Sequence, residues 1–227
     1  MTLTDLLGSP ITQDPAYHLF ADGRTLLAIP NFWNVMSNLP FLIVGAIGFQ
    51  VALEKKQEPL RTAWLAFFAG VFLTAFGSGY YHLTPDNYSL AWDRLTMTIG
   101  LMSFVAIVIG EYLSVEWGKR LLVPLLIIGA GSVLYWVYMG DLRPYAIVQF
   151  LPILVIPVIV IVRRSHSDLG PYIAGMIALY VAAKVPEHYD AQFFAAGNLF
   201  SGHSLKHVLS ALAPACLLAG FWKRQHG

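Results

Sequence analysis

The chain has 227 residues, of which 57% are hydrophobic and 12% are charged, and its formal net charge is +1. This composition excludes an ordinary soluble domain and indicates an integral membrane protein. The single cysteine, Cys216, lies in the last apolar run, which excludes an intrachain disulfide and a thiolate cluster within one chain.

Residues 1–30 form a short segment that we expect to lie outside the membrane. They contain Pro10 and three aspartates, and they lack a basic start followed by an apolar core. We therefore expect no cleavable signal peptide, and the first helix must itself direct insertion. The three aspartates are Asp5, Asp14 and Asp22.

Seven apolar runs follow, each near the length of about 20 residues that a membrane-spanning helix needs. Their approximate ranges are 32–53, 61–83, 90–111, 117–139, 143–163, 169–190 and 201–222. The connections between them are short, and no repeat period appears. We therefore expect one all-α domain over residues 1–227, a multi-pass bundle of seven transmembrane helices.

The basic residues are distributed unevenly between the two sides of this bundle. Arg24 and Arg143 fall on one side. Nine fall on the other, in the first, third and fifth connections and the C-terminal tail: Lys55, Lys56, Arg61, Lys119, Arg120, Arg163, Arg164, Lys223 and Arg224. Since positive residues stay on the cytoplasmic side, this split predicts a cytoplasmic C-terminus and an N-terminus outside.

With this topology, the unusual polar residues gather at the outer ends of five helices. Isolated intramembrane polar groups can be structural, because interhelical hydrogen bonds are worth about 0.6 kcal/mol on average. A shared membrane depth instead favours a functional site. The residues are Asn31, Asn34, Ser37, Asn38, Ser78, His82, Asp93, Glu187, His188, Asp190, His203 and His207.

Three histidines in this layer can converge on one point. His203 and His207 are four residues apart and share a helix face, and His82 shares a face with Ser78 in the same way. Three neutral imidazoles with one open position suit catalytic zinc, which lowers the pKa of bound water to about 7. Asp93 can then hold that water or take its proton, and Ser78 can donate to a developing oxyanion.

Each of these residues also has a structural interpretation. The histidines can be ordinary hydrogen-bonding residues, Asp93 can pair with Arg94 or Lys206, and Ser78 can bond back to its own helix. Haem ligation is disfavoured, because residues four apart on one helix cannot lie on opposite faces of one iron.

Lys206 in the last run raises a second alternative, a retinal Schiff base with Asp93 as its counter-ion. Lys206 lies within about two turns of the helix end, whereas a chromophore across the bundle favours a mid-helix lysine. The retinal interpretation also leaves the three histidines without a role.

Three segments carry a resemblance to a known family: "NFWNVMSNLPFLIVGAIG", "GSGYYHLT" with "WDRLTM", and "SGHSLKHVLSAL". They resemble the signature blocks of the alkaline ceramidase family, part of the CREST group of seven-helix membrane hydrolases that also includes the adiponectin receptors. The resemblance extends from the first helix to the last.

This resemblance implies a zinc amidase that splits ceramide-like lipids into a sphingoid base and a fatty acid. Residue by residue, His82, His203 and His207 match the zinc ligands, and Ser78 and Asp93 match the residues around the zinc-bound water. The expected partner is a membrane lipid and not a nucleic acid. A non-enzymatic receptor or sensor of the same superfamily is the alternative.

Two features depart from the family pattern. Members carry acidic residues before the first helix and a glutamate ahead of "FWN" that resemble a calcium site, whereas this chain has Asn31 there and few acids nearby, which argues against calcium. The segment "KVPEHYDAQFF" also differs, although Asp190 matches an aspartate of the pattern. The precise lipid substrate therefore stays open.

Overall fold

The structure is a computed structural model that describes residues 8–163 and 167–224. Within these ranges it is helical, without named strands. The helices are η1 Pro15–His18, α2 Phe32–Met36, α3 Leu39–Glu54, α4 Arg61–Leu83, α5 Asn87–Tyr112, α6 Val115–Met139, α7 Arg143–Val162, α8 Gly170–His188, α9 Asp190–Gly197 and α10 Gly202–Lys223.

Six spans in the described ranges are long and apolar enough to cross a membrane, with α2 and α3 together forming the first. These spans are consistent with the predicted multi-pass architecture. The helix α8 corresponds to the sixth predicted run but is not among these six spans, so the count of seven stays a prediction. The predicted first run is also divided, because α2 ends at Met36 and α3 begins at Leu39.

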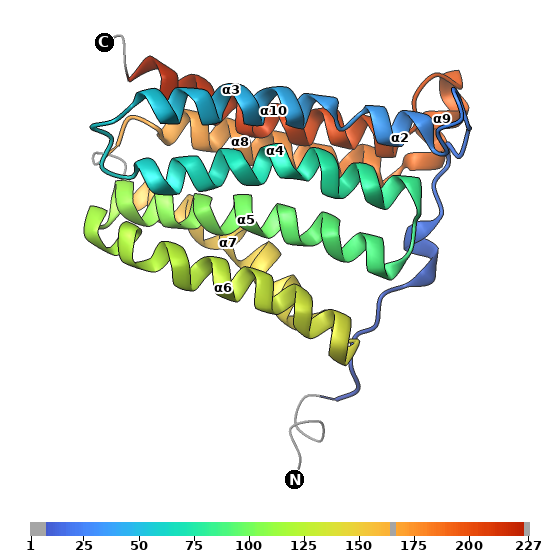
Figure 1. Ribbon diagram of the computed structural model, residues 1–227, viewed down its shortest axis with the longest axis horizontal. Coiled ribbons are helices and arrows are strands. Elements are labelled where there is room, and N and C mark those ends of the chain that lie inside the picture. Colours follow the sequence, from blue (N-terminus) through green and yellow to red (C-terminus); the bar gives the residue numbers. More distant parts are fainter. Residues whose placement is uncertain (1–7, 164–166, 225–227) are drawn as a thin grey trace.

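The long helices form a closed bundle (Figure 1). Going around it, α6 packs on α5, α5 on α4, α4 on α3, α3 on α10 and α10 on α8, while α7 contacts α5, α6 and α8. Small residues allow α4 and α5 to approach closely. A side chain on Gly70 would collide with the backbone of Gly100, so this contact requires glycine.

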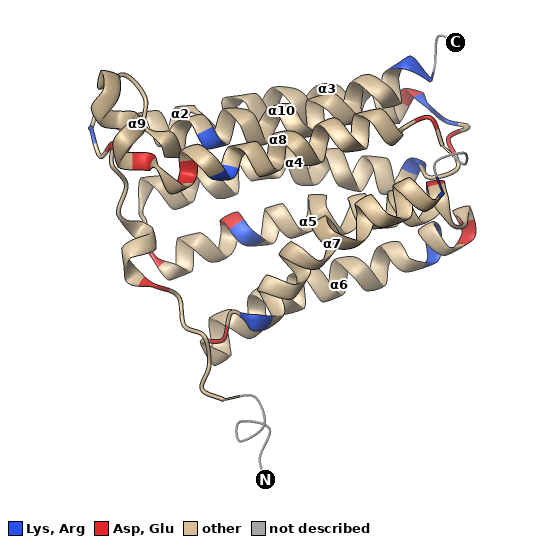
Figure 2. Cartoon of the chain, turned by 180° about the vertical axis from the view of Figure 1, so that it is seen from behind, with Lys and Arg blue, Asp and Glu red and all other residues tan. Residues whose placement is uncertain are grey.

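Most of the large buried aromatic residues lie in the half of the bundle near the C-terminus. The rings of Trp64 and Phe221 stack with centroids 4.0 Å apart, and Phe67 and Phe68 pack around Trp64. Charged residues lie at this end of the bundle, at its opposite end and within it (Figure 2). The orientation of the termini predicted from the basic residues stays a prediction, and Arg164 and Asp5 lie outside the described residues.

Candidate metal centre

The three predicted histidines meet at the opposite end of the bundle from the C-terminus. His82 ends α4, and His203 and His207 lie in the first turns of α10. Their ring centroids form a nearly equilateral triangle with sides of 4.9, 4.8 and 4.8 Å. All three are buried, and one nitrogen from each lies within 4.8 Å of the others. The cluster is compact enough to surround a single cation.

A hydrogen bond fixes which nitrogen of His207 faces the cluster. His207 Nδ1 lies 2.8 Å from Ser37 Oγ, and Ser37 donates its own hydrogen to the carbonyl oxygen of Asn34. In the tautomer with a hydrogen on Nδ1, Ser37 accepts from Nδ1–H, and a lone pair remains on His207 Nε2. That Nε2 lies 3.2 Å from Nε2 of His82.

The other two histidines carry buried nitrogens without a partner. Within the described part of the chain, neither His82 Nδ1 nor His203 Nε2 has a hydrogen bond. Such an unsatisfied group costs about 1–3 kcal/mol, which a bound cation can offset. A donor set of three imidazoles is the set that catalytic zinc uses, so the residues present fit zinc.

The start of α10 is held by polar contacts on both sides. Ser201 caps the helix by accepting from the Ser204 amide, and Asp190 Oδ1 accepts from the His203 amide at 2.7 Å. A side chain on Gly202 would collide with the carbonyl oxygen of Pro186, so α10 begins directly against the end of α8. These contacts fix the position of both histidines of α10.

The connection between α4 and α5 sets the depth of Asp93. The third helix was predicted to begin near residue 90, but α5 begins at Asn87, leaving Thr84–Asp86 as the connection. The earlier start arises from a capping box, in which Asp86 Oδ1 accepts from the Ser89 amide at 2.7 Å and Ser89 Oγ accepts from the Asp86 amide. Asp93 therefore lies in the second turn of α5.

Asp93 and Ser78 line a cavity together with His207. The Ser78 side chain lies near the Asp93 carboxylate. From this polar end, the cavity continues between α4, α5, α7, α8 and α10 along mainly apolar side chains. These include Phe67, Val71, Phe104, Ile153, Ile156 and Ile177.

The cations proposed as partners of Asp93 are engaged elsewhere. Lys206 Nζ pairs with Glu187 at 2.9 Å, and Glu187 also pairs with Lys184 at 2.7 Å. Arg94 donates to Gln13 and lies 4.1 Å above the Trp136 ring. Lys206 thus has an ion-pair role, and the ion-pair explanation of Asp93 has no hydrogen bond to support it in the described residues.

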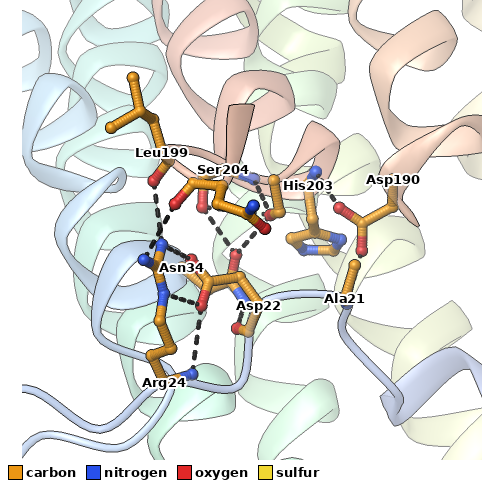
Figure 3. Close-up of polar contacts among 10 residues, drawn as sticks. Ala21, Asp22, Arg24, Asn34, Asp190, Leu199, His203 and Ser204 are labelled. Atoms are coloured by element: carbon orange, nitrogen blue, oxygen red, sulfur yellow. Dashed lines mark hydrogen bonds and ion pairs between the residues drawn. The ribbon is translucent and has the colours of Figure 1, made fainter. Parts of the chain in front are cut away.

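The place where a calcium site was considered holds an arginine instead (Figure 3). Arg24 binds both carboxylate oxygens of Asp22, at 2.7 and 2.6 Å, and donates to the carbonyl oxygens of Asn198 and Leu199. Burial by itself raises the pKa of Asp22, but the bonds from Arg24 outweigh it and hold the pKa below its ordinary value. Asn31 donates to the His82 carbonyl oxygen.

Asn34 connects this arginine pair to α10. Its Nδ2 donates to the Asp22 carbonyl oxygen, and its Oδ1 accepts from Ser204 at 2.8 Å (Figure 3). Sequence reasoning placed Asn34 in the polar layer without a role, and it missed Phe20 altogether. Phe20 packs on His82 and His203 with ring centroids 4.7 and 4.8 Å away.

The fold and the cluster define a class, an all-helical multi-pass membrane protein with a buried three-histidine centre beside a cavity. A family model described as Ceramidase matches residues 25–182, more than half of the chain, and the chain belongs to this family. The matched range contains Ser78, His82 and Asp93, whereas α10 lies beyond it. A search of curated proteins finds no match.

Proposed function

We propose that this protein is a zinc-dependent hydrolase that cleaves the amide bond of ceramide-like lipids into a sphingoid base and a fatty acid. The observation that carries the proposal is the triangle of His82, His203 and His207 beside a cavity that has Asp93 and Ser78 at one end and apolar walls beyond. Family membership supports the ceramide substrate.

The three histidines would hold zinc, with Ser37 keeping His207 in the required tautomer. Zinc held by these imidazoles would supply Lewis-acid chemistry that activates water near neutral pH and polarises a carbonyl oxygen. Asp93 accepts the proton of the attacking water and delivers it to the nitrogen of the leaving amine. Ser78 donates a hydrogen bond to the carbonyl oxygen as negative charge develops on it.

The apolar part of the cavity gives the substrate class. Eleven residues separate Ser78 from Phe67 on α4, which corresponds to about 16 Å along a helix. A cavity of this reach with walls such as Phe104 and Ile156 accommodates an alkyl chain while its amide stays near Asp93.

The proposed organisation is one domain of seven transmembrane helices with the N-terminus outside. In this proposal α8 is the additional span, and its low hydropathy reflects Lys184 and Glu187, which face the cavity rather than lipid. The ion pairs of Glu187 with Lys184 and Lys206 offset the cost of placing these charges within the bundle.

Turnover tests the proposal against the receptor alternative. Purified protein in lipid nanodiscs is incubated with long-chain ceramide, and the fatty acid and sphingoid base are quantified. We expect equimolar release of both products, abolished in Asp93→Ala protein that still binds zinc. Zinc-loaded wild-type protein that binds ceramides without releasing either product would support a receptor and overturn the enzymatic proposal.

A further inference from the structure

The N-terminal strap, residues 11–24, lies across the end of the bundle where the histidines meet (Figure 1). At its start, the Ile11 amide donates to Asp141 and the Leu142 amide donates to the Ile11 carbonyl oxygen. At its end, Arg24 binds the carbonyl oxygens of Asn198 and Leu199. The strap is thus attached to the connection between α6 and α7 and to the connection between α9 and α10.

Its middle is attached above α4 and α5. His18 lies between the Tyr81 hydroxyl, 3.0 Å from Nδ1, and Asn87 Oδ1, 3.1 Å from Nε2. The Ala21 amide donates to Asp190 Oδ2 at 2.9 Å. The other oxygen of Asp190 holds the His203 amide, so one carboxylate couples the strap to the first turn of α10.

These attachments direct one strap side chain onto the histidines. The Phe20 ring lies as close to His82 and His203 as these rings lie to each other. The preceding residue, Leu19, is 79% exposed. Phe20 therefore covers the cluster on its extramembrane side, while its neighbour points away.

The opposite side of the cluster has a different environment. His207 borders the cavity that contains Asp93 and Ser78 and continues between the helices along apolar side chains. The imidazoles therefore have the Phe20 ring against them on the strap side and a cavity with mainly apolar walls, suited to an alkyl chain, on the other.

We propose that Phe20 is a specificity-determining residue, which seals the metal centre against the aqueous phase and so restricts it to amides delivered from the bilayer. The inference rests on the proposed function. Hydrolysis consumes one water molecule per amide bond, and a single water molecule is far smaller than the amide group that the ring excludes.

The test compares Phe20→Ala with wild type in nanodiscs, using two measurements. The first is the rate at which a water-soluble chelator removes zinc. The second is the ratio of kcat/KM for a water-soluble short-chain ceramide to that for a long-chain ceramide. Because Phe20→Ala loses the ring contacts with His82 and His203, we expect the zinc removal rate and the kcat/KM ratio each to rise by about 10-fold or more. Leu19→Ala removes a similar volume from the exposed neighbouring position and should change neither.

Phe20→Ala values within about twofold of wild type for both measurements would overturn the seal. If Phe20→Ala does not fold, Phe20→Leu replaces it, and we expect a smaller rise in the same direction; an unchanged Phe20→Leu would also overturn the proposal. Wild-type protein without zinc or without turnover would instead contradict the proposed function, so the two failures are distinguishable.

Discussion

Ser37 and His207 come from opposite ends of the sequence, yet Ser37 Oγ lies 2.8 Å from His207 Nδ1 at the back of the histidine cluster. With its own hydrogen on the Asn34 carbonyl oxygen, Ser37 accepts from His207 Nδ1–H. This arrangement favours the imidazole tautomer in which Nε2 is free to bind a metal. Partners of this kind orient metal ligands and tune their affinity.

Removing this acceptor should weaken metal binding. In Ser37→Ala the Nδ1–H loses its partner, and we expect zinc affinity to fall by about 10- to 100-fold, measured by competition with a fluorescent chelator. Ser37→Thr keeps the hydroxyl and serves as the matched control, with affinity near wild type. Equal affinities in the alanine and threonine variants would show that Ser37 does not set the tautomer.

Substitutions of Asp93 and of His82 should have different effects on zinc content and on ceramide hydrolysis. His82→Ala removes a ligand, so both zinc content and ceramide hydrolysis should fall. Asp93→Asn keeps the side-chain size but loses the basic carboxylate, so zinc should stay while turnover falls by about 100-fold or more. Zinc content and hydrolysis are measured on the same preparations. Wild-type turnover in Asp93→Asn would rule out a role of Asp93 as a base. Complete loss of zinc from this variant would instead identify Asp93 as a metal ligand.

Substitution of Lys206 distinguishes the zinc interpretation from the retinal interpretation. Its side chain is 17% exposed and pairs with Glu187, so Lys206→Ala should lower the free energy of unfolding by roughly 1–3 kcal/mol while zinc content stays unchanged. Lys184→Ala should cost less, because Lys184 is 42% exposed. Thermal unfolding and metal analysis check both. A visible absorption band that disappears in Lys206→Ala would point to retinal instead.

Much of this centre could be predicted from helical periodicity. Ser78 with His82, and His203 with His207, are four residues apart, and an α-helix places such pairs on one face. The shared depth of α4, α5 and α10 follows from their lengths and short connections. Nothing comparable predicts the contacts of Phe20 with His82 or of Arg24 with Asn198, because the strap has no extended period and these contacts join residues more than 60 positions apart.

Boundaries were harder to predict than the helices themselves. The start of α5 at Asn87 depends on a reciprocal pair of hydrogen bonds between Asp86 and Ser89, which hydropathy does not reveal. The low hydropathy that keeps α8 out of the six candidate spans comes partly from charges that pair within the bundle, and a sequence window cannot distinguish inward from outward charges.

Asp141 should make the stability of the strap's attachment depend on pH. Hydrogen bonds from the Arg143 side chain lower the pKa of Asp141 to about 2, against about 3.9 in an unfolded chain. A lowered pKa contributes stability above the unfolded value that is lost as pH falls toward the folded one. Asp141→Asn should therefore unfold at a lower temperature at neutral pH, and its difference from wild type should shrink between about pH 5 and pH 2.

Thermal unfolding across this pH range checks the expectation. Glu116→Gln is the control, because the pair of Glu116 with Arg120 is exposed and should contribute little at any pH. A difference between Asp141→Asn and wild type that stays constant from neutral to acidic pH would show that the carboxylate charge is not the source of the effect.

Metal analysis of the purified full-length protein tests the central claim most directly. The triangle of His82, His203 and His207 predicts about one zinc per chain in wild type, and loss of that zinc in the double variant His203→Ala, His207→Ala. A matched variant at His188, a histidine outside the cluster, should keep its zinc. Absence of zinc from wild type, or full retention in the double variant, would contradict the account.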